Sequence, residues 1–280
     1  MEKHPSLEAR CREYQTFLVT DRGLSPITAY MRMVNVRRLL GKWRTLNPTV
    51  EQVRATRDEH VLAGYDRDYV RNIVLSFASY GDFIGADLRV KPPSKQKPPL
   101  PRFLTEAEVQ AFLFAIDSIR DRAIFGLLAY SGLRVSECCH LRREDVNFQA
   151  RTIAVRYGKG GKSSEIPVAR PALDAVSAYL RSDQRNEKSP MLFHAPNGKA
   201  LSTQRIRVLA RRYGQRAGLI KRVSPHMFRH ALATNLLGKG CPLPFVQRQL
   251  RHSKIETTMR YLHLNDTMLK ENYDRFVPNY

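Results

Sequence analysis

The chain has 280 residues, of which 42% are hydrophobic and 26% charged, and this length suits one large or two modest domains. Lysine and arginine number 47 against 26 aspartates and glutamates, so a formal net charge of +21 favours a polyanionic partner such as nucleic acid. No apolar run approaches the roughly 18 residues of a membrane span, and the N-terminus lacks a signal core. We therefore expect a cytoplasmic protein with no membrane partner.

The four cysteines are scattered, apart from the adjacent pair Cys138 and Cys139. They lack the number and spacing of a disulfide framework or a paired metal site. Neighbouring side chains on a helix also diverge by about 100°. We expect small buried hydrophobic side chains and no bound metal. The remaining cysteines are Cys11 and Cys241.

Helical periodicity dominates residues 1–90. Apolar side chains in residues 8–19 recur with the spacing of one helical face, and similar stretches follow near 49–55 and 65–81. With the helix described next, they predict a small bundle of four or five helices.

Ser25 and Pro26 are typical of an N-cap followed by the first residue of a helix. We expect this helix to turn one apolar set toward the core and a basic set toward solvent. The expected inward side chains are Ile27, Tyr30, Met31, Val34 and Leu39, and the outward ones are Arg32, Arg37, Arg38 and Lys42.

Residues 91–102 are rich in proline and lysine, which predicts an extended linker. Its lysines, including Lys95 and Lys97, suit a strap along a phosphate backbone, although a plain spacer remains open. Residues 1–90 carry 14 basic and 11 acidic side chains, and residues 91–280 carry 33 and 15. Most of the positive charge therefore belongs to the second half.

Residues 103–280 predict a mostly helical domain with a small sheet. A capping box at Thr105–Glu108 begins one helix, which should run through Ile116, and a second is expected over 120–130. Further helices are expected at 171–181, 203–217, 225–237 and 244–250.

A β-hairpin is predicted between these helices. Residues 152–157 and 164–168 are rich in branched apolar side chains and flank a glycine-rich turn. This pattern places Lys159 and Lys162 at the tip.

Five side chains follow one another in an order that suits phosphodiester chemistry. Arg134 and Arg229 supply permanently charged guanidinium groups that can each hold two phosphate oxygens. His226 and His252 can move or share protons, and Tyr261, nine positions after His252, offers a phenol as nucleophile. Together these side chains supply the groups that phosphodiester transfer needs without a metal.

Competing motifs fit less well. His226 and His230 share a helical face, but a zincin site needs glutamate directly after the first histidine, where this chain has Met227. The glycines around Lys159 lack the spacing of a P-loop. A core tyrosine is the alternative for Tyr261.

Together the motifs closely resemble the tyrosine recombinase family of phage-integrase and Xer-like enzymes. The resemblance implies an N-terminal SAM-like core-binding bundle, and a C-terminal α+β catalytic domain. It also implies an orienting role for Glu137 beside Arg134 and a general acid at the hairpin tip, with Lys162 as the alternative to Lys159. The implied catalytic residues are Arg134, Lys159, His226, Arg229, His252 and Tyr261.

The same resemblance implies site-specific cleavage and rejoining of duplex DNA through a 3′-phosphotyrosyl intermediate, with no cofactor. Four protomers would act on two DNA sites, starting from a monomer or weak dimer. Alternatives are a type IB topoisomerase or a non-catalytic DNA-binding relative. Dimer resolution and mobile-element resolution or integration both remain open. Expected DNA contacts are Arg37, Arg38, Lys95, Lys97, Lys162 and Arg251.

One position departs from the family. Arg251 stands where the family generally has glycine. The larger cation can add a DNA backbone contact or alter access to the site.

Overall fold

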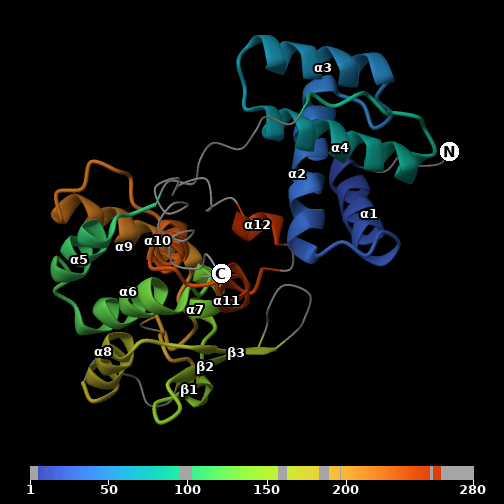
Figure 1. Cartoon of the computed structure of the whole chain (residues 1–280). Coiled ribbons are helices and arrows are strands. Elements are labelled where there is room, and N and C mark those ends of the chain that lie inside the picture. The colour runs from blue at the N-terminus through green and yellow to red at the C-terminus, as the bar shows by residue number, and fades with distance from the viewer. Residues whose placement is uncertain are drawn as a thin grey trace, which may run out of the picture. The chain divides into compact units, whose positions relative to one another are not determined.

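The computed structural model describes residues 6–94, 103–156, 163–182, 189–195, 197–252 and 255–259 (Figure 1). The chain divides into two compact units, residues 1–99 and 100–280. The division between them falls inside the proline-rich segment 91–102, which was expected to be a linker.

The N-terminal unit contains four described helices (Figure 1), each begun by an N-cap whose side-chain oxygen accepts a backbone hydrogen bond. Both α1 and α2 pack on α4, and the rings of Tyr14 and Tyr80 meet edge to face, 5.1 Å apart, between α1 and α4. The helices are α1 (Leu7–Thr20), α2 (Pro26–Trp43), α3 (Val50–Leu62) and α4 (Arg67–Ile84).

The expected inward face of α2 is wrong at its first turns. Ile27, Tyr30 and Met31 are 78%, 53% and 56% exposed. The buried stripe runs instead through residues spaced by three or four positions, because α2 carries apolar side chains on two sides and only one faces α1 and α4. The buried residues are Ala29, Met33, Val36, Leu39 and Leu40.

The C-terminal unit is mainly helical with one small antiparallel sheet, as expected from the sequence (Figure 1). Its core lies around α6, which is buried along most of its length and packs on α8 and α10. The helices are α5 (Glu106–Phe114), α6 (Ile119–Ser131), α7 (Val135–Cys139), α8 (Arg170–Leu180), α9 (Thr203–Arg216), α10 (Pro225–Gly238), α11 (Leu243–Leu250) and α12 (Glu256–Met259), with a 3-10 turn, η1, at Arg143–Asp145.

The sheet has the order β1-β2-β3, with β1 at Val146–Asn147, β2 at Thr152–Val155 and β3 at Ser164–Pro167. Ile153 opposes Ile166, and these two buried side chains anchor the hairpin on the core. The two strands of the hairpin are confirmed. Its tip, with the expected Lys159 and Lys162, lies outside the described residues.

The turn after α6 brings the next segment close to the end of α11. Gly132 has φ +69°, and a Cβ atom there would lie 2.8 Å from the Leu250 side chain. Glycine suits both the left-handed backbone and this close approach, since a Cβ atom would force the Leu250 side chain to shift. The next helix, α7, follows at once, and Arg134 is its N-cap residue.

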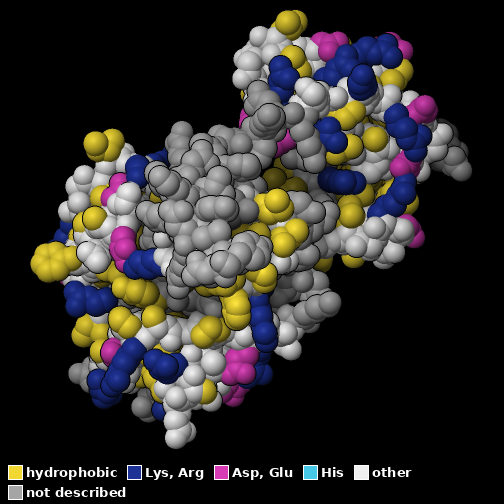
Figure 2. Space-filling model, viewed as in Figure 1, with side chains coloured by type: hydrophobic (Ala, Val, Ile, Leu, Met, Phe, Trp, Pro, Cys, Tyr) yellow, Lys and Arg dark blue, Asp and Glu magenta, His cyan; other side chains and the backbone are white. Residues whose placement is uncertain are grey.

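No helix within the described ranges combines the length and apolar character of a membrane span. On the face shown in Figure 2, lysine and arginine side chains occur on both units, interspersed with apolar ones.

Candidate active site

Arg134 and Glu137 hold each other in a reciprocal arrangement at the start of α7. The Arg134 backbone N–H donates to Glu137 Oε2 at 2.7 Å, and its Nη1 donates to Oε1 at 2.8 Å. Burial alone would raise the pKa of Glu137, but the Arg251 charge and the hydrogen bonds from Arg134 outweigh it and lower that pKa. The carboxylate therefore stays ionised and orients Arg134, whose side chain remains 26% exposed.

Arg229 lies on the buried side of α10 and joins two turns of the site. Its guanidinium donates to the carbonyl oxygens of Gly132 and Leu250. The first carbonyl belongs to the turn before Arg134, and the second to the end of α11. Arg229 therefore fixes the segment of Arg134 against the segment of Arg251 and His252.

His226 occupies the second position of α10, close to His230, with 6.1 Å between ring centroids. Partial burial, followed by the charges of Arg229 and Arg134, lowers the pKa of His226. Its imidazole is consequently neutral near pH 7 and able to accept a proton.

His252 follows α11 and is tied to the short helix α12. Its Nδ1 lies 2.9 Å from the hydroxyl oxygen of Thr258, which is fully buried. Burial, reinforced by nearby cations beginning with Arg229, lowers the pKa of His252 to about 4. Because Nδ1 is engaged by the hydroxyl, Nε2 is the nitrogen that a substrate can reach.

Lowering the pH from about 6.5 to about 4 should destabilise the fold through His252. An unfolded histidine titrates near 6.5 and the folded one at about 4, so in this window the unfolded state binds more protons. The stabilisation present above pH 6.5 is lost toward pH 4, by about 2 kcal/mol after allowance for solvent screening. Urea denaturation near pH 7 and pH 4.5 measures the change.

His252→Gln removes the titrating group and keeps a polar side chain of similar reach. The variant should lose clearly less stability than the wild type over the same pH window. An equal loss in both proteins would assign the dependence to other groups.

Arg251 ends α11 with a left-handed backbone, φ 54° and ψ 45°. For a residue with a side chain this conformation costs about 1–2 kcal/mol. Its side chain is only 10% exposed and turns into the site, where Nη2 lies 2.5 Å from Glu137 Oε2. Arg251, at the end of α11, therefore binds the Glu137 carboxylate of α7. Arg229 of α10 binds the nearby turns at Gly132 and Leu250.

The other expected site residues divide into two groups. Arg37 and Arg38 are exposed on α2; Arg37 pairs with Glu8 at 2.5 Å, and the Arg38 guanidinium lies 5.7 Å from the centroid of the Tyr69 ring. Outside the described residues lie Lys95, Lys97, Lys159, Lys162 and Tyr261.

Two residues near the site, Thr258 and Arg207, were not predicted from the sequence. Thr258, three positions before Tyr261, binds His252. Arg207 is an exposed cation of α9 that helps to lower the pKa of His226. In the sequence, Arg207 lies between the apolar residues Ile206 and Leu209. Both are buried in the structure, which places Arg207 on the solvent side of α9.

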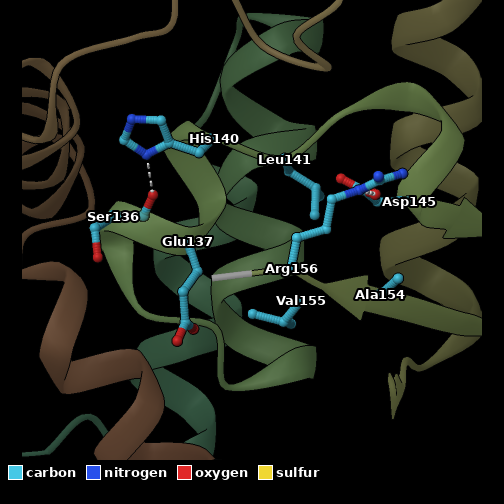
Figure 3. A pocket seen from close by; sticks show the side chains of 8 residues that line it. All are labelled: Ser136, Glu137, His140, Leu141, Asp145, Ala154, Val155 and Arg156. Atoms are coloured by element: carbon cyan, nitrogen blue, oxygen red, sulfur yellow. Dashed lines mark hydrogen bonds and ion pairs between the residues drawn. The ribbon is translucent and has the colours of Figure 1, made fainter. Parts of the chain in front are cut away.

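A small cavity of about 90 Å³ lies between α7 and β2 (Figure 3). Figure 3 shows the Glu137 carboxylate pointing away from the Arg156–Asp145 ion pair at the other side of this cavity. The pair joins the end of β2 to η1, and the cavity lies behind the Glu137 side chain.

A wider groove of about 640 Å³ is formed by α5, α6, α10 and α11. Its lining is largely apolar and includes Val109, Tyr130, Leu236 and Phe245. Phe245 lines this groove and is 66% exposed.

Comparison with known proteins assigns the family. The model of the phage integrase family matches residues 102–268. Tyrosine recombinase XerA of Thermococcus onnurineus is 34% identical, over 94% of this chain and 93% of that protein. XerA of Pyrococcus furiosus is 37% identical, over 76% of this chain and 75% of that protein.

Solved structures agree in fold. The crystal structure of XerA recombinase covers 98% of this chain and 100% of that chain with a TM-score of 0.58 and 26% identity. XerH site-specific recombinase bound to its difH substrate covers 96% of this chain and 84% of that chain with a TM-score of 0.71 and 21% identity. The chain therefore belongs to the phage integrase family of tyrosine recombinases, enzymes of site-specific DNA strand exchange.

Proposed function

We propose that the enzyme cleaves one strand of duplex DNA with Tyr261 and rejoins it to a partner strand. The phenol oxygen bonds to the scissile phosphorus while the bond to the 5′-oxygen breaks, leaving a 3′-phosphotyrosyl ester. The 5′-hydroxyl of the partner strand then attacks that ester and releases Tyr261. The observation that carries this proposal is the meeting of Arg134, Arg229 and His252 from separate segments at one carboxylate-supported site.

The charges of the site fit a phosphate undergoing substitution. Arg134 uses one Nη and its backbone N–H on Glu137, which leaves the rest of its guanidinium fork for phosphate oxygens. His252, neutral near pH 7, can donate a hydrogen bond from Nε2 when Thr258 donates to Nδ1. These groups stabilise charge on the phosphate without first losing protons of their own.

The two proton transfers of the reaction, from the phenol and to the leaving 5′-oxygen, also have a candidate base and a candidate acid. Free phenol ionises near pH 10, so attack requires transfer of its proton to a base. His226, with a lowered pKa, suits this role. The leaving 5′-oxygen takes a proton from a lysine of the hairpin tip, with Lys159 as the first candidate and Lys162 as the second.

Assembly extends the proposal. The family resemblance favours four protomers that join two DNA sites and exchange strands through a Holliday junction. Relatives that span nearly the whole chain are named tyrosine recombinase XerA and XerC, which favours an Xer-like recombinase. Because the substrate would be cellular DNA, we expect it to act in the cytoplasm.

Suicide substrates drawn from DNA around the gene test the proposal. A recombinase should form covalent adducts on a specific sequence and exchange strands between two such sites. A type IB topoisomerase would instead relax supercoiled DNA that lacks any such site. Relaxation without sequence preference would favour that second candidate.

The role of a hairpin lysine as general acid can be tested separately. Lys159→Ala should cut cleavage by about 100-fold on ordinary DNA, because the leaving alkoxide lacks a proton donor. A substrate with sulfur at the 5′-bridging position should restore the rate, since a thiolate leaves without an acid. Lys162→Ala is the matched control. Rescue of Lys162→Ala alone would assign the acid to Lys162, and rescue of neither variant would refute a hairpin acid.

The groove beside α11 suggests where the C-terminal segment docks. Residues 266–280 contain apolar side chains at helical spacing, among them Leu269, Tyr273 and Phe276. In the proposed assembly this segment enters the groove lined by Leu236 and Phe245 on a neighbouring protomer.

Truncation after Asn265 should leave binding to a single half-site within about threefold of the full chain. It should reduce cooperative pairing of two sites by at least about tenfold, because docking links the protomers. Gel-shift titrations on half-sites and full sites measure both effects. Gross unfolding of the truncated chain, seen by circular dichroism, would show that the segment docks within its own protomer.

A further inference from the structure

Arg251 occupies a backbone position that suits glycine better. The residue ends α11 with φ 54°, in the left-handed region where a side chain is strained. Its guanidinium nevertheless turns inward and is 10% exposed. The Arg251 Nε is buried without a hydrogen-bond partner among the described residues. Residues with such strain and desolvation persist only where the surrounding structure holds them in place, and they cluster at functional sites.

Its partner is the carboxylate that also holds Arg134. Glu137 Oε1 accepts from Arg134 Nη1 at 2.8 Å, and Oε2 accepts from the Arg134 backbone at 2.7 Å and from Arg251 Nη2 at 2.5 Å. One negative charge is therefore shared by two guanidinium groups. Because Oε2 is held from two sides, the carboxylate cannot rotate without breaking a contact to α7 or to the end of α11.

Two consequences follow for the phosphate site. The fixed carboxylate restricts the Arg134 side chain, whose exposed fork is the part that a phosphate can reach. In addition, the two guanidinium groups and one carboxylate carry a net positive charge, and both arginines act electrostatically on His252.

On the basis of the proposed function, we propose that Arg251 is a positioning residue for strand cleavage, which clamps Glu137 and thereby holds Arg134 in line for the scissile phosphate. A purely structural ion pair would stabilise the fold and leave the cleavage step unchanged. The two possibilities differ in what removal of Arg251 does to the chemical step.

The chain contains a matched control for the backbone. Arg44 ends α2 with φ 53° and ψ 38°, nearly the same conformation as Arg251, but its side chain is exposed and belongs to the N-terminal unit. Arg44→Gly relieves the same kind of backbone strain without touching the site. Any effect of Arg251→Gly that Arg44→Gly does not share belongs to the guanidinium.

The experiment uses the full chain and a suicide substrate in single turnover. Arg251→Gly should slow cleavage by about 10- to 100-fold through misplacement of Arg134, with half-site affinity within about threefold of wild type. Arg251→Lys keeps a cation for Glu137 and should recover most of the loss. Arg44→Gly should cleave at the wild-type rate.

A double-mutant cycle tests the route through Glu137. In the background of Glu137→Gln, the further change Arg251→Gly should slow cleavage by less than about threefold, because the clamp is already lost. Full additivity of the two changes would overturn the positioning role. A rate for Arg251→Gly within threefold of wild type would overturn it too, and so would an Arg251→Lys variant no faster than Arg251→Gly.

An NMR titration of His252 gives a readout that needs no cleavage. After burial, four cationic or titratable groups at α7, α10 and α11 lower the pKa of this imidazole: Arg229, Arg134, His230 and Arg251. Removing Arg251 should raise the His252 pKa, and an unchanged pKa would place the guanidinium elsewhere in solution, against the proposal. Absence of adducts in the wild type would count against the proposed function, whereas normal wild-type adducts with an unaffected Arg251→Gly would count against the clamp alone.

Discussion

Tyr261→Phe should abolish covalent attachment to DNA while leaving DNA binding nearly intact. The change removes one hydroxyl, which is the proposed nucleophile, and no charge that neutralises phosphate. We expect adduct formation to fall by at least about 10⁴-fold, to the limit of detection on a denaturing gel. Half-site affinity, measured by gel shift at fixed salt, should stay within about twofold.

Tyr273→Phe is the matched control, because it removes a second phenol from the same C-terminal stretch. This variant should retain the wild-type level of adducts. If Tyr261→Phe still forms adducts and Tyr273→Phe does not, the nucleophile is Tyr273 and the proposed alignment of the segment is wrong.

Arg134→Ala and Arg229→Ala should each slow cleavage by about 10³-fold or more, and the second should lower the melting temperature further than the first. Arg134 is partly exposed and bound to a single carboxylate, so its loss mainly removes phosphate stabilisation. Arg229 is buried and donates to two backbone carbonyls, which its loss leaves unsatisfied at a cost of about 2–4 kcal/mol.

Lysine at the same two positions separates charge from geometry. A lysine keeps one positive charge but lacks the planar fork, so both variants should remain at least about 100-fold slow. Near-normal cleavage by Arg134→Lys would make this arginine an ordinary phosphate anchor. Equal melting temperatures for Arg134→Ala and Arg229→Ala would contradict the structural role assigned to Arg229.

Helix positions in both units could be predicted closely from the sequence because their signals are local. Ser25 with Pro26, and Thr105 with Glu108, mark helix starts that the structure reproduces as N-caps. The buried face of α2 could not be predicted as well, since Ile27 and Met33 are both apolar and only the packing of α1 and α4 selects between them. Strand β1 has two residues, too few for any periodicity.

The candidate site shows the same division. His226, Arg229 and His252 could be singled out because they stand in short motifs with chemical meaning, whereas Arg134 rested more on the family resemblance. The pairing of Arg251 with Glu137 joins residues 114 positions apart, and the bond from Thr258 depends on how α12 folds back on His252. Neither contact leaves a pattern in the sequence, so only the tertiary structure reveals them.

Mass spectrometry of the trapped protein–DNA adduct tests directly whether Tyr261 is the nucleophile. After nuclease and protease digestion of the adduct on a suicide substrate, we expect one modified peptide, with the nucleotide linked to the Tyr261 oxygen. The attached DNA should carry the 3′-phosphate, and the released strand should end in a 5′-hydroxyl. A linkage to any other residue, or attachment through a 5′-phosphate, would show that strand cleavage does not proceed through a 3′-phosphotyrosyl bond to Tyr261.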